Sequence, residues 1–413
     1  MQKIIPWQLI ITRLVSYYDQ KAGATGKSLR IMVALLIISR LRTLSDRVVV
    51  QQVKENRYIQ YFCNVKDENL QTFVHPSLLC KFRQRLADAG IAIIEEEIFI
   101  KLRNAGIITG DDALIDSSVL ESNIIFPTDI QLVFKAYVKI AVFAKNNNIP
   151  LWWDDENVKK LWRECNLDKN KTRLEWLQIF FDTFVPALEI FQEKVASLNV
   201  SEKQKDKAEN LLNLLNLLKK QTLQKLEGQR HIKNRIVSLD DTDARPIKKG
   251  KKHPKCEFGT TEEFAFNRDG FLITVENFIG KPNDAKLYPD TIELYIERMK
   301  QCPNTVITDG GYRSQDNMKN KTPAEVNHLF MGRSTDVAEE IRDFCQRARS
   351  ATEGFIAVAK NFRGFGKSMY HGLKGHRIWS LLCQAAYNLK KFLLLYSEDK
   401  IEEEPLVKLG ILS

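Results

Sequence analysis

The clearest pattern in the chain is the stretch Gln346-Arg-Ala-Arg-Ser-Ala-Thr-Glu-Gly-Phe-Ile-Ala-Val-Ala-Lys360. Each residue of an α-helix turns by about 100°, so Arg349, Glu353 and Lys360 fall within about 40° of one another. The neighbouring sector is apolar and contains Ile341, Phe344, Cys345, Ala348, Phe355, Ile356, Ala359 and Phe362. The pattern predicts a helix with one packing face and, beside it, a carboxylate between two cations. The simplest alternative is an intrahelical Arg–Glu ion pair, worth roughly a few tenths of a kcal/mol.

Size and composition narrow the class of protein. The chain has 413 residues, enough for two or three domains, with 44% hydrophobic and 28% charged residues. A net charge of +10 favours a polyanionic partner, although many basic proteins bind nothing acidic. Seven scattered cysteines without a CxxC pair argue against a zinc module or a disulfide framework. We see no signal-peptide layout and no membrane-spanning apolar run, and we expect a cytoplasmic protein with no membrane partner.

Residues 1–108 are expected to form an all-α N-terminal domain. Ser45 is placed as an N-cap, His75 opens a further helix, and Gly90 and Gly106 are typical of helix ends. The basic face of the helix after His75 consists of Lys81, Arg83 and Arg85. This face either follows a DNA backbone or is simply solvated.

After residue 108 the pattern changes to short apolar runs, which are typical of buried strands. Residues 113–119 form the first run, and they contain Asp116. An ionised carboxylate in a core strand is costly unless it is paired or metal-bound; a strand-end Asp held by backbone amides is the alternative. The later elements are a hairpin over 260–278, a helix over 288–302 and a strand over 304–308 that delivers Asp309.

Other acidic residues are weaker candidates for a site. Asp111 and Asp112 are expected in the turn before the first strand, and Asp240, Asp241 and Asp243 in a polar connector.

The segment 129–239 returns to helical periodicity and is expected to be a large all-α insertion between the first and second core strands. Four of the six tryptophans lie in it: Trp152, Trp153, Trp162 and Trp176. They either stack on unpaired bases or, more simply, pack in the core of a helical bundle. The core is then expected to comprise 109–128 and 240–400, with 401–413 as a C-terminal tail.

Without the insertion, the order of strands and helices resembles an RNase H-like mixed sheet flanked by helices. In that fold the first and fourth strands are neighbours and the last helix packs across them, so Asp116, Asp309 and Glu353 would converge. Hard divalent cations prefer carboxylate oxygens, and two ions about 3.5–4 Å apart promote displacement at a phosphodiester. We therefore expect two Mg²⁺ ions, or Mn²⁺, with Asp116 bridging both and Asp309 and Glu353 each holding one.

Four segments together resemble bacterial insertion-sequence transposases of the DDE type, in the group with an N-terminal helical domain. The segments are Leu114–Asn123, Asp240–Lys252, Val306–Tyr312 and Arg349–Lys360. These transposases share the signature Tyr-x2-Arg-x3-Glu-x6-Lys. Arg349, Glu353 and Lys360 have this spacing, with Gln346 in place of the tyrosine.

The resemblance implies an enzyme that binds the terminal inverted repeats of its element in double-stranded DNA. It would cleave there by metal-assisted hydrolysis and join the freed 3′-OH to target DNA by transesterification. Arg349 and Lys360 would hold phosphates near the cut. Further backbone contacts are expected from Arg313, Arg363, Lys367 and Arg245. Cutting two ends implies at least a homodimer on DNA. The N-terminal domain, residues 1–108, and the helical insertion are the candidate surfaces for DNA-end binding and dimerisation.

Two other functions remain open at this stage. An RNase H-like nuclease that only hydrolyses nucleic acid would use the same three carboxylates. A non-catalytic DNA-binding protein derived from a transposase is the second alternative, and the presence of Asp116, Asp309 and Glu353 argues against it.

Overall fold

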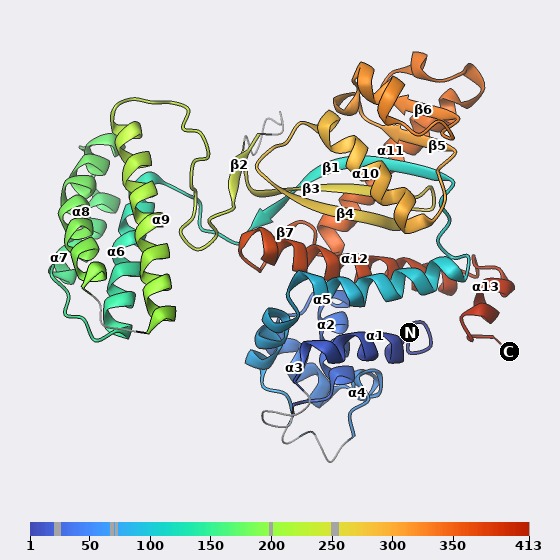
Figure 1. Ribbon diagram of the computed structural model, residues 1–413, viewed down its shortest axis with the longest axis horizontal. Helices are drawn as coiled ribbons and strands as arrows, with labels where there is room; N and C mark the ends of the chain where they lie inside the picture. The colour runs from blue at the N-terminus through green and yellow to red at the C-terminus, as the bar shows by residue number, and fades with distance from the viewer. Residues whose placement is uncertain (20–25, 67–69, 71–72, 198–200, 249–255, 413) are drawn as a thin grey trace. The chain divides into compact units, whose positions relative to one another are not determined.

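The computed structural model describes residues 1–19, 26–66, 70, 73–197, 201–248 and 256–412 (Figure 1). These residues form two compact units, and each is described by itself. We call Met1–Asn123 together with Gly259–Ser413 the sheet unit, and Ile124–Phe258 the helical unit. The segment 129–239, expected as an insertion, lies inside the helical unit.

A mixed sheet forms the centre of the sheet unit (Figure 1). Its strands are β1 (Asp112–Ser122), β3 (Glu257–Phe266), β4 (Leu272–Ile279), β5 (Thr305–Thr308), β6 (His328–Met331) and β7 (Lys367–Ser368). β1 pairs with β3 antiparallel on one side and with β5 parallel on the other. β4 pairs antiparallel with β3, β6 pairs parallel with β5, and β7 pairs parallel with the end of β1. The expected α/β class with a mixed sheet is confirmed.

Helices cover this sheet and extend its core. They are α1 (Trp7–Leu14), α2 (Leu29–Leu41), α3 (Asp46–Glu55), α4 (Arg57–Cys63), α5 (Pro76–Asn104), α10 (Asp284–Met299), α11 (Glu339–Phe362), α12 (Gly372–Ser397) and α13 (Glu403–Lys408). Side chains alternate along β1: Ile115 packs in the same cluster as Tyr288 and Tyr295 of α10, and Leu114 packs in another with Ile356 of α11. The two faces of β1 therefore look toward different helices.

Residues 1–108, expected as a domain of their own, share one hydrophobic core with the sheet. Leu36 of α2 and Ile94 of α5 belong to the same buried cluster as Val306 of β5 and Leu389 of α12. The C-terminal tail joins it too, because Leu409 is buried there. The N-terminal helices are thus packed into the sheet unit.

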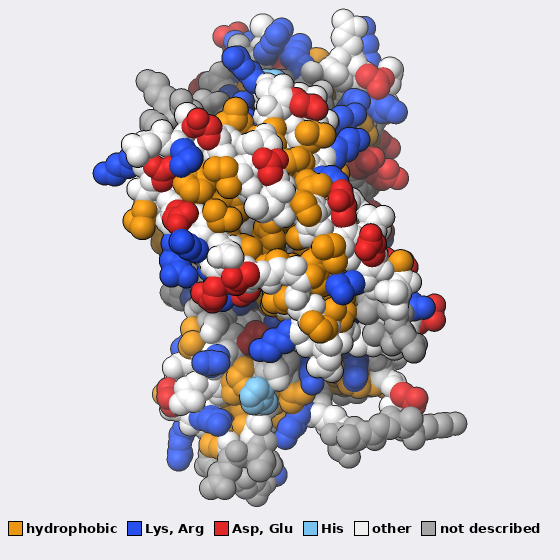
Figure 2. Space-filling view, turned by 90° about the vertical axis from the view of Figure 1, so that its left-hand side faces the viewer, with side chains coloured by type: hydrophobic (Ala, Val, Ile, Leu, Met, Phe, Trp, Pro, Cys, Tyr) orange, Lys and Arg blue, Asp and Glu red, His pale blue; other side chains and the backbone are white. Residues whose placement is uncertain are grey.

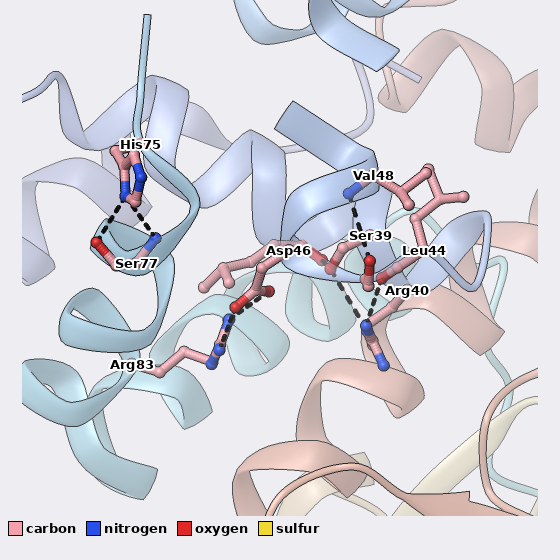
Figure 3. Close-up of polar contacts among 10 residues, drawn as sticks. Ser39, Arg40, Leu44, Asp46, Val48, His75, Ser77 and Arg83 are labelled. Carbon is pink, nitrogen blue, oxygen red and sulfur yellow. Dashed lines mark hydrogen bonds and ion pairs between the residues drawn. The ribbon is translucent and has the colours of Figure 1, made fainter. Parts of the chain in front are cut away.

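Polar contacts fix the start of α3 and of α5 (Figure 3). The Ser45 side chain accepts a hydrogen bond from the Val48 amide, as expected for an N-cap, and His75 caps α5. Arg83 is buried. Its two terminal guanidinium nitrogens donate hydrogen bonds of 2.9 and 2.6 Å to the two carboxylate oxygens of Asp46. Arg83 therefore does not belong to an exposed basic face.

Gly90 corrects a second expectation, because the break in α5 lies at Ala87 (φ +52°) and Gly90 itself is helical. A methyl group there would stand 3.2 Å from the Tyr17 ring. Gly90 thus allows close packing inside the helix and does not end it. Gly106, with φ at +84°, does follow the end of α5.

The helical unit contains α6 (Asp129–Asn146), α7 (Asp155–Leu167), α8 (Arg173–Ala196), α9 (Glu202–Leu226) and the short strand β2 (Arg245–Ile247). Trp176 is buried and donates to Asp168, and Trp152 donates to the Ala187 carbonyl. Trp153 packs edge-on against Trp152. All four tryptophans, Trp162 included, pack in or against the core of the helical unit, which was the simpler interpretation.

Large hydrophobic side chains also reach the surface of the helical unit. They include Val138, Val142, Leu151, Leu167, Leu174, Ile190, Leu217 and Leu223. Figure 2 shows one side of the structure, on which hydrophobic side chains gather between clusters of charged ones. Across the described ranges, no helix combines the length and apolarity needed to span a membrane.

Candidate functional site

Asp116 lies in the middle of β1, on the face that looks toward α11. Its partner across the antiparallel ladder is Phe264, which is buried in the same cluster as Ile356 of α11. Directly opposed residues share a face of the sheet. The Asp116 carboxylate also accepts a hydrogen bond of 2.7 Å from the Ser117 amide. The strand therefore fixes both the depth and the direction of this carboxylate.

Asp309 follows β5 at the level of Asp116, because Ile115 is in register with Thr308. Its carboxylate accepts a hydrogen bond of 2.7 Å from the Gly311 amide and so caps a short 3₁₀ turn. Gly332, with φ at +76°, allows this turn to pack closely: a methyl group there would stand 2.4 Å from the Gly310 nitrogen. The turn holds Asp309 at the strand end.

Glu353 and Arg349 extend from α11 to the same place. A cavity of about 40 Å³ is lined by Ile115, Asp116, Ile307, Thr308, Asp309, Arg349, Thr352 and Glu353. Among the residues with described positions, Arg349 and Glu353 form no ion pair with each other. The alternative of a plain intrahelical pair is therefore not what this helix adopts. Of the lining residues, Thr352 was not anticipated; its hydroxyl donates to the Ala348 carbonyl.

The donor atoms of this cavity fit a hard divalent cation, because they are three carboxylates from three elements. The Glu353 carboxylate makes no hydrogen bond or ion pair with any other described residue. Within the ranges that the structure covers, no three His, Cys, Asp or Glu side chains are gathered tightly enough to form a finished ion site. The three carboxylates thus line one cavity, but they are not drawn together into a closed coordination shell.

More acidic residues lie on the opposite face of β1, and the sequence did not single them out. Ser117, next to Asp116, donates to Asp284 of α10 at 3.3 Å. A methyl group on Gly311 would stand 3.0 Å from an oxygen of Asp284 and 3.0 Å from an oxygen of Asp309. Asp284 thus lies beside the Asp309 turn. Helix α10 was expected to start only at residue 288. The sequence signal for the earlier start is Asn283, a typical N-cap residue whose side chain caps α10 and so places Asp284 in its first turn.

Glu263 of β3 completes this second acidic group. It is 1% exposed and opposes Ser117 in the ladder. Burial raises the pKa of Glu263 to about 8, and Asp284 adds to the rise. The hydroxyls of Thr291 and Tyr312 oppose the rise but lie outside hydrogen-bond geometry. Burial therefore favours the protonated, neutral form of the Glu263 carboxyl.

Tyr312 lies among all of these carboxyls. Burial raises its pKa well above the usual value, with further contributions from Glu263, Asp116, Asp284 and Asp309 in that order.

Asp112 also differs from expectation, because it is the first residue of β1 and not part of the preceding turn. Burial raises its pKa, and the Thr305 side chain opposes the rise.

The other predicted DNA-binding residues lie in different settings. Lys360 is half-buried near the end of α11, and Arg363 follows that helix. Lys367 is exposed on β7 and paired with Glu121, about 17 Å along β1 from Asp116 at about 3.3 Å per residue. Arg313 forms an ion pair with Asp336, whose side chain is only 1% exposed.

Arg245 belongs to the helical unit and donates to the carbonyls of Thr242 and Ala244. Burial lowers its pKa. Residues 249–255, which include most of the lysines after β2, lie outside the described residues.

Comparison with known proteins adds independent information. Residues 1–85 match a family model described as Transposase domain (DUF772). The N-terminal part of this chain is thus similar to that transposase domain. It lies outside the four segments on which the transposase resemblance was based, so its match confirms that resemblance independently. The matched residues 1–85 comprise α1 to α4 and the start of α5, including the Asp46–Arg83 ion pair.

A relative from Rhizobium meliloti, named "Uncharacterized protein ORF8 in nfe locus", is 27% identical to this chain over 155 residues. The match covers 36% of this chain and 72% of the relative. In the comparison with solved structures, none matches the chain.

Proposed function

We propose that this protein is an insertion-sequence transposase of the DDE type, with Asp116, Asp309 and Glu353 as its catalytic acids. One observation carries the proposal: these three carboxylates, from β1, the end of β5 and α11, line a single cavity together with Arg349. They are distant in sequence, and their convergence is the arrangement that phosphodiester chemistry with divalent ions requires. The transposase domain at residues 1–85 supports the same conclusion.

The sheet supports an RNase H-like core. Starting from β4, the pairings run through β3, β1 and β5 to β6, with β3 antiparallel and β5 parallel to β1. This places the first and fourth strands of the core side by side, as expected for that fold, and α11 packs against both. The helical unit then interrupts the core between its first two strands.

Each site residue has a distinct role in this proposal. Asp116, Asp309 and Glu353 would hold divalent cations, which supply charge stabilisation and an activated nucleophile when bound. Arg349, one helical turn before Glu353, would bind the phosphate being cut and keep it on the acidic cavity. The Gly311 amide and the Ser117 amide hold Asp309 and Asp116 in orientation.

The reaction has two displacements at phosphorus. In the first, a water oxygen bonds to phosphorus, the bond to the 3′ oxygen breaks, and the element end is left with a free 3′-OH. In the second, that 3′-OH attacks a phosphodiester of the target, and a target 3′-OH leaves. Both ends of an element must be processed together, so we propose that a homodimer acts on DNA.

Cationic residues beyond the cavity support a DNA path along α11. Lys360 and Arg363 lie near the helix end, and Lys367 lies about 17 Å from Asp116 at about 3.3 Å per strand residue. That length equals roughly five base pairs at about 3.4 Å each. These cations would contact backbone phosphates without reading sequence.

The test is incubation of the full-length protein with duplex DNA that flanks its gene, with Mg²⁺, with Mn²⁺ or with a chelator. We expect cation-dependent nicks that leave 3′-OH ends, followed by joining of these ends to a labelled target duplex. Nicks without joined products would indicate a nuclease that lacks strand transfer. Neither nicks nor joined products with either cation would contradict the proposal.

A further inference from the structure

The helical unit contains a large cleft that the proposed chemistry does not use. It has a volume of about 730 Å³, within the range of ligand-binding sites. Its walls include one tryptophan, Trp162, and four charged residues, Asp129, Arg173, Lys225 and Arg235. The start of α6, the end of α7, the start of α8 and the end of α9 meet there (Figure 1).

The charge of this cleft is positive. Three cations line it, namely Arg173, Lys225 and Arg235, and Asp129 is the one acidic residue among the lining side chains. Asp129 is bound by Arg235 at 2.6 Å. No acidic side chain of the described chain pairs with Arg173 or Lys225. The partial positive charges at the N-termini of α6 and α8 are offset by the partial negative charges at the C-termini of α7 and α9, which meet at the same cleft. The three cationic side chains therefore decide the sign of the charge, and the cleft suits an anion.

An aromatic ring forms part of the same wall. Trp162 stacks on Phe134, with ring centroids 4.6 Å apart and an angle of 11° between the planes. Phe180 holds it edge-on at 6.4 Å. Trp162 is half-buried and lines the cleft, unlike the buried Trp176. Arg173 donates a hydrogen bond of 3.7 Å to the Cys165 sulfur, and neither Arg173 nor Lys225 has a carboxylate partner among the described residues. A rigid indole next to such cations is the combination that binds a base and its phosphate.

We propose that this cleft binds an unpaired nucleotide of single-stranded DNA, with the base against Trp162 and the phosphate between Arg173 and Lys225. A duplex would be bound less well, because its base faces are covered by stacking and pairing. Leu174 and Leu177 complete the apolar part of the wall. The cleft itself suits a nucleotide of either nucleic acid. The choice of DNA as the ligand rests on the proposed function.

The test uses the full-length Asp116→Asn variant, which does not consume its substrate, and a labelled oligothymidylate of about 16 nucleotides. Trp162→Ala should weaken its binding about tenfold, whereas Trp162→Phe, which keeps a stacking ring, should stay within about threefold. Arg173→Ala with Lys225→Ala should lower the salt dependence by roughly 0.7 in the log–log slope, the value for one phosphate contact on a single strand.

Arg163→Ala is the matched control. It removes a cation on α7 next to Trp162 that does not line the cleft and pairs with Glu156 at 3.5 Å. Its binding should equal that of the parent protein, as should the melting temperature of Trp162→Phe. These two results, with the losses above, would support the cleft as the site.

Three results would overturn the inference. The first is unchanged oligothymidylate affinity in Trp162→Ala. The second is equal affinity for the oligonucleotide and for its duplex, which would indicate general backbone attraction. The third is tighter binding of oligouridylate, which would favour RNA. Absence of DNA cleavage by the wild-type protein would contradict the proposed function and leave these binding results standing.

Discussion

The two units carry cavities of opposite charge. The sheet unit gathers three carboxylates and one guanidinium around a space of about 40 Å³. The helical unit places three cations and an indole around about 730 Å³. The small acidic cavity is built on paired strands and a helix packed on them, which fixes its geometry closely. The wide cationic cleft is built from the ends of four helices. We infer that bond chemistry belongs to the sheet unit and strand capture to the helical unit.

The largest expected effect tests the acidic cavity. Glu353→Gln should lower the rate of DNA cleavage at least about a thousandfold, because it removes one of three charged ligands. Glu340→Gln is the control, since Glu340 is exposed in the first turn of the same helix and does not line the cavity. Single-turnover cleavage of end DNA gives both rates. Equal rates for the two variants would remove Glu353 from the site.

The pH dependence of stability separates the acidic residues of the two units. The pKa of Glu263 is raised to about 8 by burial. The folded protein therefore retains this proton after the unfolded chain has lost it, and its stability falls as pH rises from the ordinary glutamate range to about 8. The loss is roughly 1 kcal/mol for each pH unit and levels off above that value.

Glu263→Gln should remove this decline, and urea unfolding from pH 5 to 9 measures it. Asp240 of the helical unit should behave in the opposite sense, because a hydrogen bond from Lys139 lowers its pKa. Its contribution is present above the ordinary aspartate value and is lost as pH falls. A decline with rising pH that persists in Glu263→Gln would contradict the assignment.

Arg349 tests whether the acidic cavity also holds phosphate. Arg349→Ala should lower cleavage about 10- to 100-fold, and Arg349→Lys should restore part of the loss because it keeps the charge without the planar fork. Oligothymidylate binding should not change in either variant, because that site is in the helical unit. A parallel loss of both activities would break the division between the two units.

The smallest effect is expected at Gly354 of α11. No atom lies within 4 Å of a methyl group placed there, and the helix continues through it. Gly354→Ala should therefore raise the free energy of unfolding by up to about 1 kcal/mol. If DNA runs along this helix, end binding should weaken while stability rises. Unchanged binding would mean that DNA does not approach α11 at this position.

The catalytic candidates could be found from the sequence because each sits in a strong local pattern. Asp116 interrupts an apolar run, Asp309 follows one, and Glu353 lies on an amphipathic helix whose apolar stripe fixes its orientation. Asp284 and Glu263 could not be found in this way. Their proximity to Asp116 depends on the pairing of Ser117 with Glu263 and on the packing of α10, which no local pattern records.

Partners that are distant in sequence account for the other differences. Arg83 has the spacing of an exposed face, yet it pairs with Asp46. Gly90 has the composition of a helix end, yet it serves contact with Tyr17. In the helical unit, tryptophan content alone did not separate Trp162, which lines the cleft, from Trp152, Trp153 and Trp176. Its position at the junction of four helix ends does.

The most direct test of the central claim is cleavage of end DNA by the Asp116→Asn variant in Mg²⁺, measured beside its affinity for the same DNA. The account predicts that cleavage is lost and that end binding stays within about threefold of the wild-type value, because Asp116 acts in the chemical step and makes no contact that holds the DNA. Cleavage at the wild-type rate would contradict the assignment of Asp116, Asp309 and Glu353 as the catalytic acids.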